Sequence, residues 1–125
     1  MSPEMLIDSV ILIDHFSGWE QATQFILNVD PGRSVISVIT RAEILVGFSE
    51  DELEAPKALL NQYKTLEIDK NIADKAAALR REHGWKLPDA FQAALCIENK
   101  IILMTRNTKD FDPCRHPFVE VPYRI

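Results

Sequence analysis

Several oxygen-bearing side chains that lie far apart in the sequence have the chemistry expected of a metal site. Each follows a short apolar run or lies in the first turns of a predicted helix, and together they are Asp8, Glu43, Asp89, Asn107 and Asp110. Hard divalent cations such as Mg²⁺ and Mn²⁺ prefer carboxylate and other oxygen ligands. A carboxylate among apolar neighbours is unfavourable unless a cation or a donor pairs with it. The sequence therefore predicts an acidic metal pocket, provided that the fold brings these residues together.

Alternating strands and helices predict a fold that would bring these residues together. Apolar runs predict strands at 5–7, 34–37, 65–68, 101–104 and 118–121. Between them, helical spacing of apolar residues predicts helices at 10–16, 19–29, 38–48, 50–63 and 70–83, and another that begins at Leu87. We expect an α/β fold of three layers, with a mostly parallel central sheet of about five strands flanked by helices. The carboxyl ends of parallel strands meet at one edge, where ligands of such sheets bind.

Length and composition limit the possible classes of protein. The 125 residues, 46% hydrophobic and 26% charged, predict a single soluble domain over 1–125. No apolar run approaches the ~20 residues of a membrane span. The start lacks the basic segment of a secretory signal, and the two cysteines suggest neither a metal knuckle nor a redox pair, so we expect a cytoplasmic protein without a membrane partner.

The acidic balance does not exclude a nucleic-acid substrate. The formal net charge of −5 argues against a broad basic surface that binds nucleic acid by charge alone. Two divalent cations held by the acids would bring the net charge to about −1.

Each acid also has an ordinary structural role open to it. Asp8 could be a loop or cap residue, Asp89 could complement a helix dipole from the first turn, and Asp110 could be a solvated loop acid. Glu43 is harder to explain in this way, because its helix neighbours three and four positions away are largely apolar. The cations that could pair with Glu43 are Arg41 and Arg106.

Four segments together resemble a known family. They are residues 8–14, 37–47, 87–94 and 105–111, and they contain the candidate acids in order. In these segments the sequence resembles PIN-domain ribonucleases, and specifically the VapC-type toxins of toxin–antitoxin systems. The resemblance covers essentially the whole chain. It departs from the family pattern at Val10, where Asn is usual, and at Asn107, where many members have Asp.

The resemblance implies a metal-dependent endoribonuclease, the toxin of a type II toxin–antitoxin system, which hydrolyses RNA with Mg²⁺-activated water. Asp8, Glu43 and Asp89 are the expected metal ligands, by direct or water-mediated contact, and Mn²⁺ is a possible replacement for Mg²⁺. Asn107 or Asp110 would complete the catalytic set. The residues expected to orient ligands or contact the substrate are Ser9, Arg41, Thr105 and Arg106.

The same resemblance implies protein partners. VapC-like proteins usually form homodimers and are inhibited by a small cognate antitoxin that covers or fills the active-site groove. The apolar surfaces of the helices at 10–19 and 50–63 could serve such contacts. Trp85 could stack on a base, or it could pack beneath the turn at Gly84.

Two other classes of protein were weighed against the ribonuclease. A phospho-acceptor receiver domain also gathers acids at strand ends, but the sequence lacks its paired acids, and Glu67 and Asp69 are poorly placed as the acceptor. A catalytically silent PIN-like module that only binds RNA or protein stays open because of Val10 and Asn107. Glu43 and Asp89 argue against it.

Overall fold

Parallel strands form the centre of the molecule. The computed structural model describes residues 3–124, and within that range five strands pair in the order β3-β2-β1-β4-β5, all parallel. The strands are β1 (Met5–Ile7), β2 (Ser34–Ser37), β3 (Lys64–Leu66), β4 (Ile102–Met104) and β5 (Val119–Glu120). The order places β1 between β2 and β4, so the chain changes direction across the sheet at β1.

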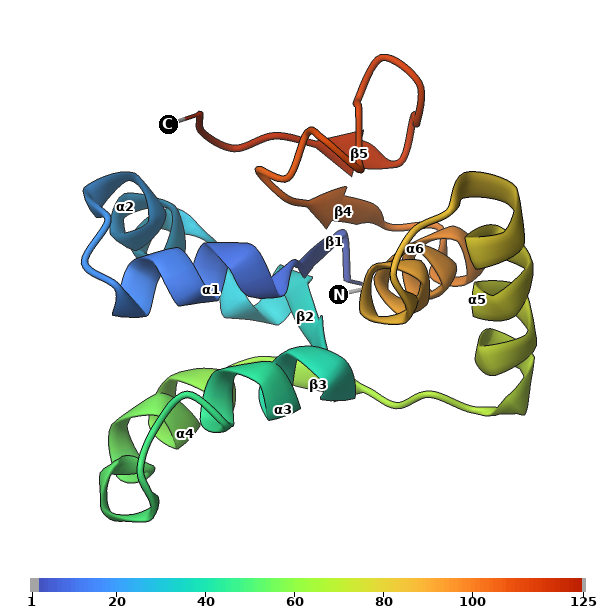
Figure 1. Cartoon of the computed structure of the whole chain (residues 1–125). Coiled ribbons are helices and arrows are strands. Elements are labelled where there is room, and N and C mark those ends of the chain that lie inside the picture. Colours follow the sequence, from blue (N-terminus) through green and yellow to red (C-terminus); the bar gives the residue numbers. More distant parts are fainter. Residues whose placement is uncertain (1–2, 125) are drawn as a thin grey trace.

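Helices cover both faces of this sheet (Figure 1). They are α1 (Ser9–Phe16), α2 (Glu20–Asn28), α3 (Val38–Leu45), α4 (Glu54–Leu60), α5 (Lys70–His83) and α6 (Leu87–Asn99), with short 3₁₀ turns η1 (Pro31–Arg33) and η2 (Glu50–Glu52). The first four helices pack on one face, and α5 and α6 pack on the other. The predicted three-layer α/β architecture with a parallel sheet is confirmed.

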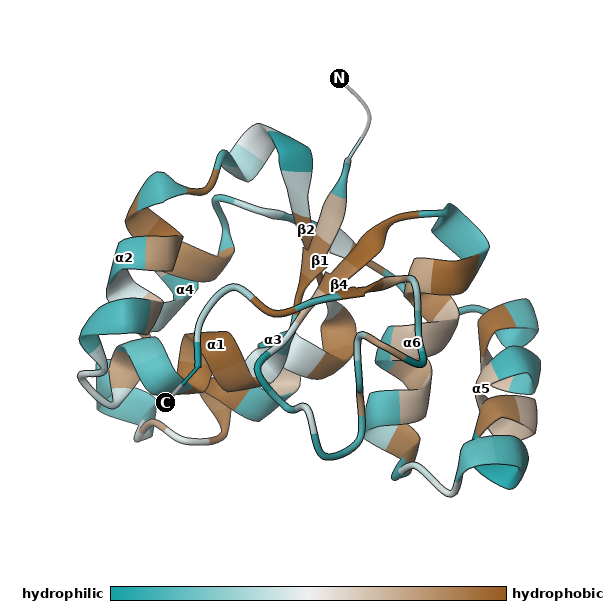
Figure 2. Ribbon diagram, turned by 90° about the horizontal axis from the view of Figure 1, so that it is seen from above, coloured by the Kyte–Doolittle hydropathy of each residue, from teal (hydrophilic) through white to brown (hydrophobic). Residues whose placement is uncertain are grey.

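The strands divide the hydrophobic core into two parts because successive side chains point to opposite faces. Leu6, Val35 and Leu103 pack with α5 and α6. The residues that follow them, Ile7, Ile36 and Met104, pack with α1 to α4. Figure 2 shows these strands as hydrophobic segments between the helices, whose outer sides are largely hydrophilic. Burial on both faces explains why the strands are short continuous apolar runs.

The ends of β1 and β4 are fixed next to each other. The backbone N–H of Asp8 donates to the carbonyl of Met104 over 2.9 Å, and the N–H of Thr105 donates to the carbonyl of Glu120 over 3.1 Å. Asp8 and Thr105 therefore leave neighbouring strands at the same edge of the sheet. This is the crevice in which open α/β sheets bind ligands.

Helix boundaries differ from the prediction, most clearly in the predicted helix at 38–48, which ends at Leu45, and in the one at 50–63. The predicted helix over 50–63 is interrupted at Leu53, because Pro56 has no N–H to donate and fits only in the first turn of a helix that starts at Glu54. The cap of α1 is Asp8, whose carboxylate accepts from the N–H of Ser9, and this is one of the ordinary roles considered for this acid. The Ser9 hydroxyl is thereby available for other contacts.

Two large apolar residues at or near the ends of helices lie at the surface, Val46 and Ile97. Val46 is 83% exposed because α3 ends at Leu45, one residue before it. Ile97 is also exposed. No helix among residues 3–124 is both long and apolar enough to span a membrane.

Candidate functional site

The crevice at the ends of β1 and β4 contains a pocket of about 200 Å³. It is lined by Asp8, Ser9, Val10, Ile13, Glu43, Asp89, Arg106 and Asn107. All three expected metal ligands are in this set, although they come from the end of β1 and from two different helices. The fold therefore brings together acids that are separated by up to 81 positions in the chain.

Asp8 is the most enclosed of the three acids. Its side chain is held by the N–H of Ser9 at 2.9 Å and by the Gln92 amide at 3.3 Å on Oδ1, and by the Thr105 hydroxyl at 2.7 Å on Oδ2. Burial raises the pKa of Asp8 above its ordinary value, and the hydrogen bonds offset part of that rise. The contacts fix the carboxylate, but they do not neutralise its charge.

Asp89 lies in the first turn of α6, lines the pocket and is partly buried. Burial is the largest cause that raises its pKa to about 6, followed by the negative charges of Asp8, Asp110 and Glu43. Lys86 offsets part of the rise. The acids therefore lie close enough to repel one another, which is the electrostatic condition that a bound cation relieves.

Glu43 lies beside apolar side chains, as its helix neighbours indicate, since it lines a pocket with Ile44 and Phe48, but it is not buried among them. The residue is exposed on α3, where its neighbour Val46 also faces outward. One carboxylate oxygen nevertheless accepts a short hydrogen bond of 2.6 Å from the Ser9 hydroxyl. Glu43 thus combines a fixed orientation with access to solvent.

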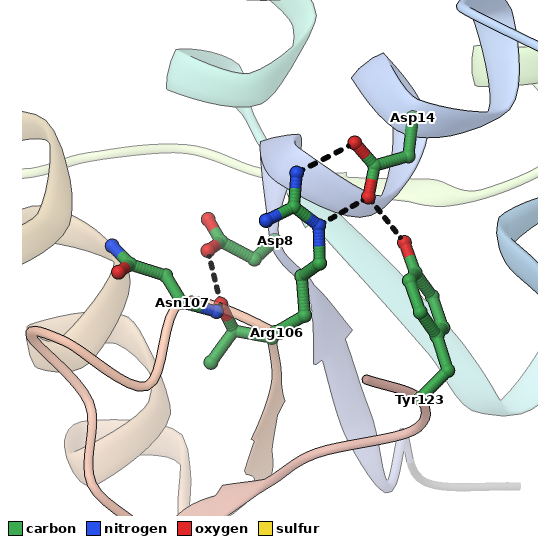
Figure 3. A network of polar contacts seen from close by, with 6 residues as sticks. Asp8, Asp14, Arg106, Asn107 and Tyr123 are labelled. Atoms are coloured by element: carbon green, nitrogen blue, oxygen red, sulfur yellow. Dashed lines mark hydrogen bonds and ion pairs between the residues drawn. The ribbon is translucent and has the colours of Figure 1, made fainter. Parts of the chain in front are cut away.

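Neither of the two arginines pairs with Glu43. Arg41 donates to the side chain of Asn61 over 3.0 Å and does not line the pocket. Arg106 does line the pocket, but its guanidinium is paired with Asp14 through Nε and Nη2, the latter at 2.8 Å from Oδ1 (Figure 3). Glu43 is therefore left without a cationic partner among the described residues.

Asn107 and Asp110 form one unit rather than two alternatives. The Asn107 amide donates to the Asp110 carboxylate over 3.1 Å. Asn107 lines the pocket, whereas Asp110 lines a neighbouring one. The backbone N–H of Asn107 also donates to the Thr105 hydroxyl over 3.0 Å, which ties this loop to the residue that holds Asp8.

Of the two roles considered for Trp85, packing inside the protein is the one that the structure supports, and stacking on a base is not. Only 5% of the residue is exposed, and its indole N–H donates to the carbonyl of Asp110 over 2.9 Å. One face stacks on His83 with ring centroids 4.2 Å apart. Trp85 supports the loop that carries Asp110.

The sequence did not reveal four residues around the pocket. Thr40 and Gln92 are buried and connect the acids through hydrogen bonds, while Asp14 and Tyr123 hold Arg106. The available signal for Gln92 was a polar residue within the apolar segment from Ala90 to Cys96. Asp14 is only 3% exposed, and its hydrogen-bond partners Arg106 and Tyr123 are far away in the sequence.

The donor set fits a hard divalent cation that keeps part of its water. Among residues 3–124, no three Asp, Glu, His or Cys side chains converge closely enough to form a ready set of direct ligands. Asp8, Glu43 and Asp89 instead share the lining of one open pocket. Mg²⁺ is commonly bound in proteins by one or two carboxylates and several waters.

Comparison with known proteins agrees with the fold and the motifs. A toxin–antitoxin complex from Klebsiella pneumoniae contains a chain 38% identical to this one, with 98% of this chain and 100% of that chain covered and a TM-score of 0.85. DNA-bound VapBC from Salmonella typhimurium shares the fold at 20% identity, with coverage of 97% and 99% and a TM-score of 0.80. VapBC-5 from Mycobacterium tuberculosis shares it at 23% identity, with coverage of 99% and 98% and a TM-score of 0.61.

No curated protein matches the chain. The model of the PIN domain family, in contrast, matches residues 5–113, which include all four motif segments. The resemblance noted in those segments is thus confirmed over most of the sequence. On this match, together with the 38% identity over nearly the full length, the chain belongs to the PIN domain family.

Proposed function

We propose that this PIN domain, acting as a single domain over 1–125, is a metal-dependent endoribonuclease and the toxin of a toxin–antitoxin pair. The observation that carries the proposal is the shared pocket of Asp8, Glu43 and Asp89, in which burial, followed by neighbouring negative charges, raises the pKa of Asp89. The resemblance to a toxin–antitoxin complex supports the toxin role.

Asp8, Glu43 and Asp89 would hold Mg²⁺, or Mn²⁺ in its place. When bound, the ion lowers the pKa of a water and offsets negative charge that develops on the scissile phosphate. Thr105 orients Asp8, and Ser9 orients Glu43, through the hydrogen bonds described above.

Arg106 is the cation best placed to contact the RNA backbone. It lines the pocket, and its pairing with Asp14 leaves Nη1 without a hydrogen bond among the described residues. Asn107, with Asp110 behind it, lies on the other side of the pocket and would contribute an amide oxygen or a hydrogen-bond donor. Arg41 lies outside the pocket, so its contribution to substrate binding would be indirect.

An apolar pocket next to the acids supports binding of an antitoxin. It has a volume of about 280 Å³ and is lined in part by Phe16 and Phe48. Ile13 and Glu43 line both pockets, so a segment bound in the apolar one would reach the acidic one. We further propose that the protein acts in the cytoplasm as a homodimer and that a short cognate antitoxin covers this groove.

Cleavage of RNA by the purified protein tests the function. We expect cleavage of a mixed RNA substrate with Mg²⁺ or Mn²⁺, no cleavage in EDTA, and a loss of roughly 100-fold or more in Asp8→Asn and Asp89→Asn. Asp74→Asn is the matched control, because Asp74 is exposed on α5 and outside the pocket. Cleavage that survives EDTA or both substitutions would contradict the mechanism, and RNA binding without cleavage would favour the silent module.

A further inference from the structure

A continuous chain of buried hydrogen bonds links two of the acids. Gln92, on α6, donates through Nε2 to Asp8 over 3.3 Å and to the hydroxyl of Thr40 over 2.8 Å. The hydroxyl of Thr40 lies 3.0 Å from that of Ser9, and Ser9 donates to Glu43 over 2.6 Å. Gln92 and Thr40 are at most 1% exposed. The acids at the two ends of the chain of bonds both line the pocket.

The direction of these bonds is fixed by the groups that take part. The Gln92 amide has two N–H groups, one for Asp8 and one for Thr40. The Thr40 hydroxyl accepts from Gln92, so its own proton is available to Ser9, whose proton goes to Glu43. Every donor is therefore aimed toward a carboxylate, which stabilises the ionised acids that a cation requires.

The opposite orientation of the amide is excluded on electrostatic grounds. Rotating it by 180° would place Oε1 against the Asp8 carboxylate, which has no proton to donate when ionised. In the actual orientation, Gln92 Oε1 is buried and has no hydrogen-bond partner among the described residues. A buried amide oxygen without a partner lowers stability. An apolar side chain would avoid that loss, but it would also remove the two bonds that Gln92 donates to Asp8 and Thr40, so the value of glutamine here lies in these two bonds.

We propose that Gln92 is a positioning residue of the metal site, which holds Asp8 directly and Glu43 through Thr40 and Ser9. The inference rests on the proposed function, because it assigns Gln92 a role toward the cation that Asp8 and Glu43 would bind. Residues that orient metal ligands affect affinity although they do not touch the ion. In this way Gln92 connects Asp8, at the end of β1, to Glu43 on α3.

A purely structural role for Gln92 leads to a different expectation. If the side chain only fills space between α6 and the sheet, its replacement by methionine, which has a similar length and no amide, leaves cation affinity unchanged. If it positions the acids, the same replacement weakens cation binding whether or not the melting temperature changes. Cation affinity therefore separates the two roles.

Titration with Mn²⁺, followed by electron paramagnetic resonance of the free ion, measures that affinity without any RNA. The variants are Gln92→Met, which removes the bonds to both Asp8 and Thr40, and Thr40→Val, which keeps the bond between Gln92 and Asp8 but removes the connection to Ser9 and Glu43. Thr40→Val also removes the acceptor of the Ser37 hydroxyl, 3.4 Å away. Thr23→Val is the matched control, because the Thr23 hydroxyl bonds to His15 over 2.9 Å and neither residue lines the pocket. Asp8→Asn reports on the metal site itself, and thermal unfolding is recorded for every variant.

We expect the Mn²⁺ dissociation constant to rise about 10-fold or more in Gln92→Met, and to rise in Thr40→Val, with Thr23→Val at the wild-type value. Wild-type affinity in Gln92→Met and Thr40→Val, with weak binding in Asp8→Asn, overturns the role of Gln92 and leaves the metal site in place. Wild-type affinity in Asp8→Asn overturns the metal site and this inference with it. If Gln92→Met does not fold, the Thr40→Val titration decides.

Discussion

The carboxylate of Asp14 and the guanidinium of Arg106 form a two-pronged ion pair between α1 and the loop after β4 (Figure 3). Asp14 is almost fully buried, whereas the Arg106 side chain is 26% exposed. The phenol of Tyr123, near the carboxyl end of the chain, donates to the same carboxylate over 2.7 Å. Three distant segments therefore meet at Asp14, and they fix the arginine that lines the acidic pocket.

Asp14→Asn should destabilise the protein by about 2–3 kcal/mol at neutral pH, because Arg106 loses the charge that compensates it in a partly buried position. The pair with Arg106 lowers the pKa of Asp14 below its ordinary value of 3.8, so its contribution is fully present above that value and is lost as the pH falls below it. Urea unfolding of both proteins from neutral pH down to about pH 3 measures this. Asp74→Asn, in an exposed position on α5, should change stability by less than about 0.5 kcal/mol. Equal stability of the wild type and Asp14→Asn at pH 7 would contradict the role of the pair.

Tyr123→Phe removes one hydrogen bond to Asp14 and leaves the ring in place. We expect a loss of about 1 kcal/mol in the free energy of unfolding, because the bond is short and its acceptor is charged. Tyr63→Phe is the matched control, since Tyr63 is buried but its hydroxyl makes no hydrogen bond among the described residues. Denaturant unfolding of both variants checks this, and an equal loss in the two would show that the bond to Asp14 is not the cause.

Local patterns in the sequence were sufficient to predict most of the fold. The strand at 34–37 and the helix at 70–83 have the predicted bounds, because apolar runs, caps and the glycine at position 84 act over a few residues. The break before α4 was missed although its cause, Pro56, is equally local. Three of the four predicted acids, Asp8, Glu43 and Asp89, line one pocket, whereas Asp110 lines another. Asp8 and Asn107 meet there because the carboxyl ends of parallel strands lie at one edge of the sheet.

The contacts between distant side chains could not be predicted in this way. Asp14 and Arg106 are 92 positions apart, and no local rule relates a residue on α1 to one after β4. Gln92 is a similar case, since its partner Asp8 follows β1 and its partner Thr40 lies on α3. Such pairs depend on how helices pack across the sheet, which is decided by the whole core rather than by any one segment.

In the metal-free protein, Asp89 should make the free energy of unfolding depend on pH in the opposite direction from Asp14. Its pKa is raised to about 6 from 3.8, so the folded state holds a proton more tightly than the unfolded chain, and stability falls as the pH rises through this range. We therefore expect Asp89→Asn to be more stable than the wild type at about pH 7.5 in EDTA, with the difference shrinking toward about pH 4.5.

Urea midpoints of the two proteins across this range, in EDTA, provide the measurement. Mg²⁺ should then stabilise the wild type at the upper end of the range but not Asp89→Asn, because a ligand stabilises the state that binds it. A difference in urea midpoint that stays constant across the range would show that folding does not raise the pKa of Asp89.

Arg106→Lys separates the charge of Arg106 from its geometry. A lysine retains the positive charge, but a single ammonium group cannot bond to both oxygens of Asp14 and also face the pocket as the guanidinium does. If Nη1 contacts the RNA backbone, the KM for RNA should rise about 10-fold while kcat changes little, since the contact would be equally strong in the bound substrate and in the transition state. Arg41→Lys is the matched control, because Arg41 bonds to Asn61 outside the pocket and its replacement should leave KM unchanged. Steady-state kinetics on one RNA of defined sequence distinguishes the two arginines. A rise in KM for Arg41→Lys alone would contradict the role of Arg106 and place the phosphate contact on α3.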